Sequence, residues 1–429
     1  MHSIRNGLCV MVAALSLFAV FGSMPVLGEQ PVTLQYYSLA WQPGVVKAVR
    51  AAVKAWNEAN PDIQVDIVWG SWAAANEFLL TSFLGGDAPD VFHQDAVMCY
   101  EYGTMGFAEP LDAYITPEER ADIAPWMWES ASGYDGTTYG FPFLVETHAV
   151  FYNRTLFATA GIDVPSNHEI SWEELVEYAQ RLTTRDETGE VRTWGLLASV
   201  MEKFPWMLVL QNDGRIVHRN DDGTWFVEVD ERAEEALRYY CDLVTKWGVM
   251  PPDAISSDYT YLMNGFAHER YAMIIYGCWN RRILVQWGDV DWGILHLQGP
   301  VNNITSAGPQ AHGIWAGSKH KDEAAQFLHF LSTRENVVDI SYPDWIFPAR
   351  DSGQEDPLFS QPEHWWDLAK SWLIYSADVL PRMPTIIAFD MRVVVPEIEQ
   401  VMLGTQSFED AIEAINRQGN DYLKKTGLQ

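Results

Sequence analysis

The sequence predicts an α/β protein built as two lobes. Along most of the chain, segments with strand-like alternation of apolar residues are followed by segments with helical spacing, which favours parallel sheets flanked by helices. Two such runs stand on either side of YGFPFLVETHAVFYN, residues 139–153, and no flexible linker separates them. The length of 429 residues exceeds what one small core needs, so we expect two to three domains.

The first run predicts three strands with a helix in each interval. In chain order these are a strand in 31–41, a helix in 45–56, a strand in 63–69, a helix in 76–86 and a strand in 91–95. Asn60-Pro61 ends the first helix, because the residue before a proline is biased away from helical geometry. Consecutive strand–helix–strand units pair in parallel with a right-handed crossover by default.

The second run follows the same logic with longer helices. Ser171 and Glu174 form a capping-box pattern, and the helix over 231–248 ends at a glycine that precedes two prolines. The remaining segments are a helix over 171–182, a strand at 193–199, a hairpin over 212–229, an apolar strand at 270–279, and late helices over 321–332 and 407–425.

The first 28 residues read as a cleavable signal peptide. Arg5 precedes a short apolar run, and Val26 and Gly28 occupy the −3 and −1 positions of a cleavage site. The run is shorter than a membrane span needs, and Cys9 precedes it, too early for a lipidation cysteine. We therefore expect a protein free in the periplasm, with secretion as the alternative.

Charge and cysteine content exclude several classes of function. The formal net charge of −30 repels phosphate backbones and anionic membranes, so nucleic acid is a poor partner. Cys99, Cys241 and Cys278 permit at most one disulfide and carry no CxxC spacing. No P-loop and no GxGxxG follows a predicted strand, so we expect no nucleotide cofactor, and no metal-ligand spacing is present.

Eight segments in a constant order resemble one known family. They are AWNEANPDIQVDIV, LLTSFLGGDAPDVFHQD, GFAEPLDAYI, DGTTYGFPFLVETHAVFYN, SWEELVEYAQRLT, YAMIIYGCWNRR, QAHGIWAGSKHKDEAAQFLHFLS and MLGTQSFEDAIEAI. In this order they are similar to the family 1 extracellular solute-binding proteins of ABC importers, a maltose-binding-protein-like, carbohydrate-binding group. The chain departs from the family at Ala311-His312-Gly313, where many members have two glycines.

The resemblance implies a two-lobed periplasmic binding protein fold of type II, with each lobe a mainly parallel sheet flanked by helices and a ligand cleft at the hinge. It implies an N-terminal lobe of residues 29–145 plus 313–350 and a C-terminal lobe of 146–312 plus 351–429. It also implies a monomer that captures a carbohydrate, with an oligosaccharide as the expected kind, and delivers it to membrane permease subunits. The family is not enzymatic, so no catalytic residue and no cofactor are expected.

Candidate ligand contacts follow from sugar chemistry. Flat aromatic rings cover the C–H face of a sugar, and charged or amide groups bind its hydroxyls. Trp41, Trp69 and Trp72 follow the first two strands, and Asp95 ends the third, where α/β sheets place ligands. The resemblance adds Glu146, at the family's ligand-binding glutamate position in the crossing strand, and the candidates His148, Phe204, Trp206, Trp279, Arg281, His312 and Trp345, with Gln94, Phe389 and Asp390 as secondary ones.

Two other functions remain open at this stage. A secreted glycoside hydrolase would need two carboxylates about 5–9.5 Å apart, and Asp95 with Glu146 is the pair that could be proposed. A binding protein for a polyamine or a metal ion would suit the acidity, but the histidines are scattered and the DxDxDG calcium pattern is absent.

Overall fold

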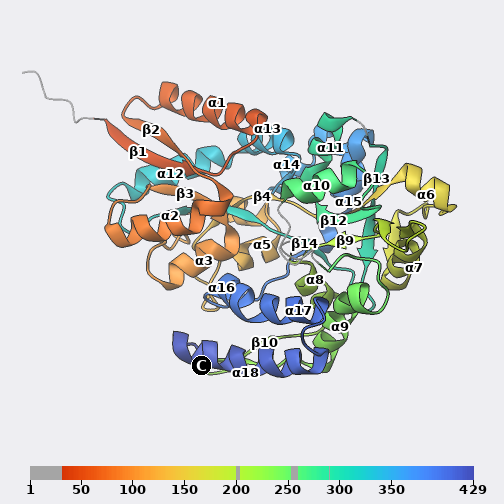
Figure 1. The fold of residues 1–429 in the computed structure, drawn as a ribbon. Helices are drawn as coiled ribbons and strands as arrows, with labels where there is room; N and C mark the ends of the chain where they lie inside the picture. The colour runs from red at the N-terminus through yellow and green to blue at the C-terminus, as the bar shows by residue number, and fades with distance from the viewer. Residues whose placement is uncertain (1–30, 200–202, 253–258, 289) are drawn as a thin grey trace, which may run out of the picture.

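The computed structural model describes residues 31–199, 203–252, 259–288 and 290–429. Two sheets organise the chain, one in each lobe, and helices cover both (Figure 1). The predicted signal peptide, residues 1–28, lies outside the described residues. The two-lobed α/β architecture predicted from the alternation of strands and helices is confirmed.

The first lobe is built on a six-stranded sheet. In spatial order its strands are β16 (Phe347–Pro348), β4 (Phe141–Val145), β15 (Gln310–Ile314), β3 (Val91–Asp95), β1 (Val32–Ser38) and β2 (Ile63–Trp69). The helices of this lobe are α1 (Pro43–Ala59), α2 (Trp72–Gly85), α3 (Ala96–Thr104), α4 (Pro117–Ala121), α5 (Pro125–Ser130), α12 (Lys321–Leu331), α13 (Arg334–Asp344) and α14 (Asp351–Gln354). The stripe at helical spacing on α1, from Val45 to Trp56, is buried as predicted.

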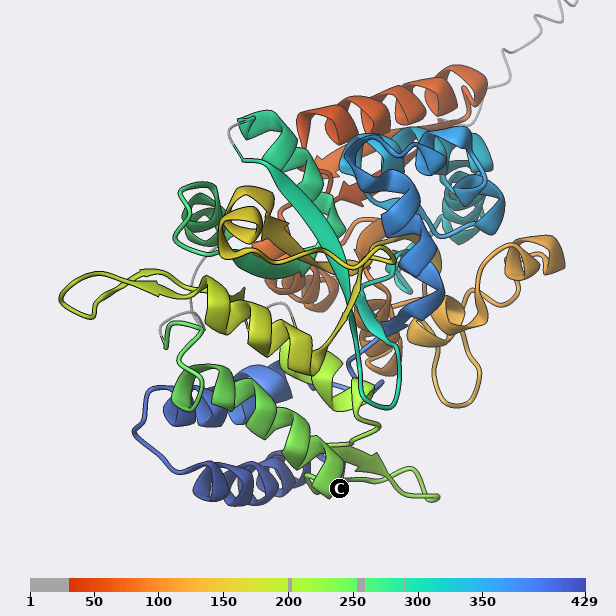
Figure 2. The same cartoon turned by 90° about the vertical axis from the view of Figure 1, so that its right-hand side faces the viewer.

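The second lobe is built on a five-stranded sheet. Its order is β6 (Glu169–Ser171), β13 (Trp292–Gln298), β5 (His148–Asn153), β12 (Met273–Gly277) and β9 (Leu197–Ala198). Its helices are α6 (Arg154–Ala160), α7 (Trp172–Leu182), α10 (Tyr259–Ala267), η3 (Cys278–Asn280) and α11 (Arg281–Trp287). The capping box at the start of α7 forms in both directions between Ser171 and Glu174, as the pattern predicts. Figure 2 shows the hairpin of β7 (Thr184–Arg185) and β8 (Val191–Thr193) projecting from this lobe.

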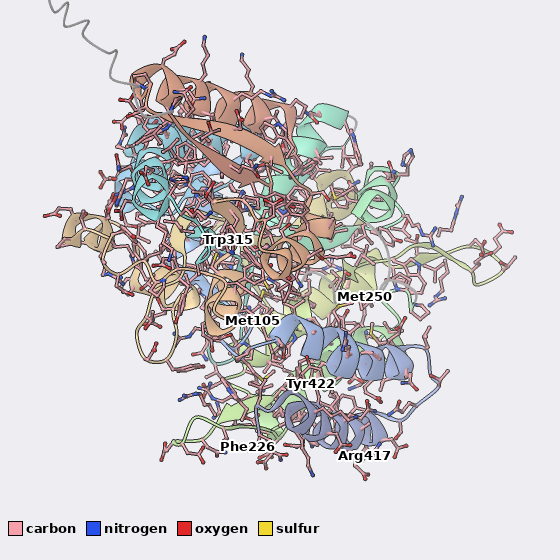
Figure 3. The ribbon with its side chains drawn as sticks, turned by 90° about the vertical axis from the view of Figure 1, so that its left-hand side faces the viewer. Met105, Phe226, Met250, Trp315, Arg417 and Tyr422 are labelled. Carbon is pink, nitrogen blue, oxygen red and sulfur yellow. The ribbon has the colours of Figure 1, made fainter. Side chains whose placement is uncertain are left out.

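A further helical layer completes the second lobe. It contains α8 (Phe204–Gln211), α9 (Glu231–Thr245), α16 (Ile386–Phe389), η7 (Asp390–Val394), α17 (Val395–Met402) and α18 (Phe408–Thr426), with the hairpin of β10 (Val217–Arg219) and β11 (Trp225–Val227). Figure 3 shows the hairpin with Phe226 and the helix α18 with Arg417 at the bottom of the molecule, and Asn420 of α18 forms hydrogen bonds with the backbone of Val227. Shorter elements on the way to this layer are η4 (Pro357–Ser360), η5 (Glu363–Trp365), α15 (Trp366–Ser371) and η6 (Trp372–Tyr375).

The prediction of mainly parallel sheets holds for strand direction but not for hydrogen-bonded pairs. Four strands of the first sheet run one way, yet β15 lies between β3 and β4 and pairs antiparallel with both. In the second sheet β5 lies antiparallel between β12 and β13. β15 and β5 directly follow a passage of the chain between the lobes, so the return of the chain explains their reversed direction. The short edge strand β16 also pairs antiparallel with β4, and it follows α13 within the first lobe.

Three segments carry the chain between the lobes, and we call them the crossing segments: residues 145–148, 307–310 and 376–380. The first joins β4 to β5, the second joins β14 (Thr305–Ala307) to β15, and the third contains β17 (Ser376–Asp378), which pairs parallel with β14. The predicted lobe boundaries stay a prediction. Residues 310–312 pair within the first sheet because β15 begins at Gln310, three residues before the predicted boundary at 313.

Three general expectations can be compared with the described residues. Cys99, Cys241 and Cys278 are separate buried thiols. Within the described ranges, no helix combines the length and apolar character needed to cross a membrane. In the same part of the chain, no three His, Cys, Asp or Glu side chains are grouped so that they could hold a metal ion.

Candidate functional site

The crossing segments bring three carboxylates to the junction between the lobes. Asp95, at the end of β3, is in register with Gln310, and Asp378 is in register with Ala307. Oε1 of Glu146 lies 3.9 Å from the position that a Cβ would take on Gly308, between those two segments. The carboxyl ends of strands from the first lobe and the passages to the second therefore share one polar region.

Polar side chains hold the first two crossing segments together. Thr305 donates its hydroxyl to the carbonyl of His148 at 2.9 Å, and Nδ1 of His148 lies 3.0 Å from the carbonyl oxygen of Ser306. Thr147 and His148 are both buried, so their polar groups serve strand-to-strand contacts inside an otherwise apolar run. This explains why the polar residues Thr147 and His148 interrupt an apolar run. It also places His148, a predicted ligand candidate, in the contact between the first two crossing segments.

Glu146 is fixed by a close approach to the second lobe. A Cβ at Gly277, the last residue of β12, would overlap Oε2 of Glu146 and the indole of Trp279. Gly277 is therefore required by space, because only a residue without a side chain leaves room for both groups. The approach sets the Glu146 carboxylate beside the Trp279 ring, although Glu146 lies between β4 and β5 and Trp279 lies in η3.

Two tryptophans meet across the lobes. Trp41 follows β1 of the first lobe and is 48% exposed, and Trp279 follows β12 of the second lobe. Their ring centroids are 5.8 Å apart with the planes at 89°, an edge-to-face pair. Trp279 also packs edge-on against Tyr276 at 5.6 Å. The structure thus brings together Trp41, Trp279 and Glu146, three residues that the sequence predicted.

A second group of charges surrounds Lys203, at the start of α8. Burial raises the pKa of Asp390 to about 6 and that of Asp378 to about 6, and Asp95 adds to the rise at Asp378. Lys203 lies close enough to both carboxyls to oppose the rise. Asp390 also accepts a hydrogen bond of 2.8 Å from the indole nitrogen of Trp206. These two carboxyls are therefore poorly solvated, and both lie within electrostatic reach of Lys203.

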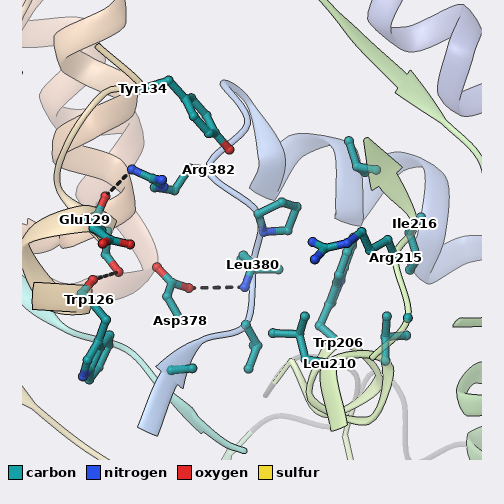
Figure 4. Close-up of a pocket in the computed structure, with 17 residues that line it drawn as sticks. Trp126, Glu129, Tyr134, Trp206, Leu210, Arg215, Ile216, Asp378, Leu380 and Arg382 are labelled. Carbon is teal, nitrogen blue, oxygen red and sulfur yellow. Dashed lines mark hydrogen bonds between the residues drawn. The ribbon is translucent and has the colours of Figure 1, made fainter. Parts of the chain in front are cut away.

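A cavity of about 300 Å³ opens beside this group, between the two lobes (Figure 4). One wall comes from the first lobe, with Trp126, Glu129 and Tyr134. The opposite wall comes from the second lobe, and the chain after β17 lies between the walls. The lining includes aromatic, acidic and basic side chains: Trp126, Glu129, Tyr134, Trp206, Arg215, Asp378 and Arg382. Aromatic faces beside guanidinium and carboxyl groups are the combination that a polyhydroxylated ligand requires.

Arg281 has a different position from the one predicted, and this is a correction. Its side chain is fully buried, and its guanidinium donates to the carbonyls of Cys278 at 2.8 Å, Trp345 at 3.0 Å and Trp365 at 3.2 Å. The charged group also stacks over Trp366 at 4.2 Å. With its donors occupied by backbone carbonyls, Arg281 clamps α11 to two distant turns and offers no surface to a ligand.

His312 and Phe204 are also core residues in this structure. His312 is fully buried in β15, with Nε2 2.9 Å from the hydroxyl of Tyr36 and its ring 4.3 Å from Phe143. Burial lowers the pKa of His312 well below its ordinary value, so the ring is neutral. Phe204 is 1% exposed and packs edge-on against Tyr240. The histidine that replaces a family glycine therefore fills a core and does not point to a cleft.

The remaining tryptophan candidates face different environments. Trp69 lies under Arg50 of α1, 4.9 Å from ring centroid to guanidinium carbon, and so faces the helical side of the sheet. Trp72 is 37% exposed and packs edge-on against His93 near the end of β3. Trp345 ends α13 and its half-buried ring lies 5.3 Å from His364. Of the three, Trp72 retains the most accessible face near Asp95.

Several site residues escaped the sequence reasoning, among them Lys203, Asp378 and Arg382. Lys203 caps the start of α8, Asp378 ends the short strand β17 and Arg382 lies in a loop, and no periodicity or motif marks these positions. Asp390 was a secondary candidate, and it accepts a hydrogen bond from Trp206. This contact places both residues near the cavity, and their ligand roles stay a prediction. Proximity created by the crossing segments is the property that unites them, and a single sequence does not display it.

Comparison with known proteins gives a consistent assignment of fold and family. The family described as bacterial extracellular solute-binding protein matches residues 41–338. An uncharacterized lipoprotein encoded in the oleD 5' region of Streptomyces antibioticus is 30% identical over 84% of this chain and 80% of its own length.

Solved structures show the same fold. An ABC substrate-binding protein from Listeria monocytogenes in complex with cycloalternan is 24% identical, with a TM-score of 0.76 over 93% of this chain and 100% of its own. The sugar-binding protein MalE from Xanthomonas citri is 22% identical, with a TM-score of 0.77 over 92% of this chain and 98% of its own. The predicted two-lobed periplasmic binding protein fold is confirmed by these likenesses.

Proposed function

Because the chain belongs to the bacterial extracellular solute-binding proteins, we propose that it captures a carbohydrate between its lobes and delivers it to a membrane permease of an ABC importer. The observation that carries the proposal is the pairing of Trp41 and Trp279 from opposite lobes, 5.8 Å apart, beside the carboxylate of Glu146. Cycloalternan and sugar are the ligands named for the two structural relatives, which supports the same ligand class here.

The site chemistry fits a neutral polyol rim and an apolar sugar face. Rings of Trp41 and Trp279 supply rigid apolar area, and Glu146 and Asp95 supply acceptors for hydroxyls. Gln42 follows Trp41 and is 2% exposed, and neither amide atom has a hydrogen-bond partner among the described residues. A ligand hydroxyl at Trp41 would satisfy that amide, which is costly to bury alone.

Closure of the lobes supplies the mechanism of capture. A ligand stabilises the closed form only through contacts that it makes with both lobes, and Trp41 and Trp279 provide one from each. We propose a monomer in the periplasm, which agrees with the extracellular character of the family. No catalytic step is part of the proposal, so Asp95 and Glu146 act as hydrogen-bond acceptors.

Calorimetric titration of the mature protein with a panel of oligosaccharides tests the function. We expect at least one sugar to bind near the micromolar range, about −8 kcal/mol. Trp279→Ala should weaken that sugar ~10- to 100-fold, because a stacked ring contributes roughly 1–3 kcal/mol. Trp247→Ala is the matched control, since Trp247 packs on Tyr239 of α9, away from the crossing segments. Sustained release of reducing ends, or binding of spermidine or a metal ion alone, would contradict the proposal.

A further inference from the structure

Two arginines stack on Tyr134, which lines the interlobe cavity, and a third arginine lines the opposite wall. The guanidinium carbons of Arg219 and Arg382 lie 4.2 Å and 4.5 Å from the ring centroid of Tyr134. Arg215 lines the same cavity from the opposite wall (Figure 4). The chain has 58 acidic residues and only 28 basic ones, so a gathering of arginines at one place is against its composition.

In the described part of the chain none of these guanidinium groups forms a direct ion pair with a carboxylate, although Arg219 lies within electrostatic reach of Asp222. Arg232, close to Arg215 in sequence, pairs with Asp213 at 3.3 Å. By contrast, across the described ranges Arg215, Arg219 and Arg382 take part in no ion pair within 4.0 Å. In an acidic protein the carboxylates needed to pair them are abundant. The lack of a direct pair therefore leaves N–H donors of Arg215 and Arg382 available at the cavity.

Arg382 is held in position by the first lobe. Its Nη1 donates to the carbonyls of Glu129 at 3.0 Å and Ser132 at 3.2 Å, which fixes the group against the loop that carries Tyr134. Burial raises the pKa of Tyr134, so its hydroxyl stays protonated and can donate at neutral pH. Arg382 and Tyr134 thus form a prepared pair of donors on one side of the cavity.

Two carboxyl groups share the cavity and set the limit on its positive charge. Asp378 accepts from the backbone N–H of Leu380 at 3.2 Å, and burial raises its pKa to about 6. Glu129 is exposed at the rim. The positive charges of Arg215 and Arg382 balance the two carboxyl charges of the cavity lining. Arg219, which stacks on Tyr134, adds a further positive charge nearby. The cavity is thus well suited to one anionic group near the guanidiniums and to hydroxyls near the carboxyls.

We infer that the carbohydrate proposed above is an acidic one, whose carboxylate, phosphate or sulfate group is bound by Arg215 and Arg382 with the hydroxyl of Tyr134. The inference rests on the proposed function and names the ligand class for the interlobe site. Guanidinium forks match the paired oxygens of such groups, and aromatic faces of Trp126 and Trp206 stand close by for the ring. Because Arg215 belongs to the second lobe and Arg382 is fixed to the first, the anion would favour the closed form.

The test compares acidic sugars with neutral counterparts of the same skeleton. Oligogalacturonates and their methyl esters, glucose 6-phosphate and glucose, and sulfated and unsulfated oligosaccharides are titrated into the mature protein, with inorganic phosphate as a separate arm. We expect one acidic form to bind at least tenfold more tightly than its neutral counterpart. Arg215→Gln and Arg382→Gln should each weaken that form about tenfold or more, while Glu129→Gln should strengthen it.

Variants and controls separate the inference from the proposed function. Arg154→Gln, a surface change in α6, should leave every affinity unchanged, and melting curves verify that each variant is folded. Arg215 is exposed and makes no side-chain hydrogen bond within the described residues, so its variant should fold normally even if Arg382→Gln disturbs the loop. Equal or tighter binding of the neutral sugars overturns the inference and leaves the proposed function intact. Binding of no carbohydrate overturns both, and binding of inorganic phosphate without any sugar preference overturns the inference.

Discussion

Replacing Arg281 should lower the stability of the protein, because its side chain links α11 to two turns that are distant in the sequence. Four charge-assisted hydrogen bonds leave its guanidinium, to the carbonyls of Cys278, Trp345, His364 and Trp365, at 2.8–3.4 Å. At ~1.5 kcal/mol each they contribute about 6 kcal/mol, and stacking over an aromatic ring adds about 1–2 kcal/mol.

Burial of the charge opposes this gain. The pKa of Arg281 is lowered from 12.5 to about 10 by desolvation, which at ~1.4 kcal/mol per pH unit costs about 3 kcal/mol. Arg281→Ala should therefore lower the free energy of unfolding by about 4 kcal/mol, within the range expected when a buried charged partner is removed.

Urea unfolding followed by tryptophan fluorescence measures the change. Arg154→Ala is the matched control, because Arg154 is 52% exposed in a surface ion pair with Asp291 and should cost less than about 1 kcal/mol. The fraction of Arg281→Ala that remains folded should keep its affinity for sugar. A variant with nearly unchanged stability that no longer binds sugar would refute the structural role and restore Arg281 as a ligand contact.

Three further changes test the geometry of the lobe junction. Gly277→Ala should force Glu146 and the Trp279 ring apart, so sugar affinity should fall more than tenfold while the melting temperature changes little; an unchanged affinity would show that the close approach is not needed. Asp390→Asn should remove a pH dependence: the pKa of Asp390 is raised to about 6, so the folded wild type binds more protons than the unfolded chain between about pH 4 and 6, and its stability falls as pH rises through that window. The variant should match the wild type near pH 4 and exceed it by about 1–3 kcal/mol at pH 7 in urea titrations, and parallel curves would contradict the raised pKa. Thr305→Val should lose about 1 kcal/mol through the bond to the carbonyl of His148, with faster hydrogen exchange in residues 145–148, whereas protected amides there would disprove the role of that bond.

The strands and helices of both lobes were open to prediction because local patterns determine them. Alternation in 31–41 and 63–69 produced β1 and β2, and the serine–glutamate box at Ser171 produced the start of α7. Trp41 was a candidate because it follows the first strand, where α/β sheets place ligands, and Trp279 and Glu146 were candidates because of the family resemblance. Their positions were predictable, and their ligand contacts stay a prediction.

The failures share one physical cause. Arg281 and His312 carry polar groups in apolar segments. Such a pattern in the sequence is compatible with a ligand contact and equally with a buried side chain whose hydrogen bonds are made inside the protein. Only the fold brings the carbonyls of Trp345 and Trp365 to Arg281 and the hydroxyl of Tyr36 to His312. Hydrogen bonds between residues far apart in the chain decide which reading is correct.

By itself the sequence determined the alternation of strands and helices in an α/β architecture, because apolar periodicity and turn residues act over a few neighbouring positions. The resemblance of eight segments added the family and the two-lobed fold, and the edge at which a ligand would sit stays a prediction. The tertiary structure alone decided which side chains face that edge. Asp390 became the partner of Trp206, and Lys203 came within electrostatic reach of Asp378, only when three passages of the chain met between the lobes. Contacts over long sequence separations depend on that meeting and leave no local pattern.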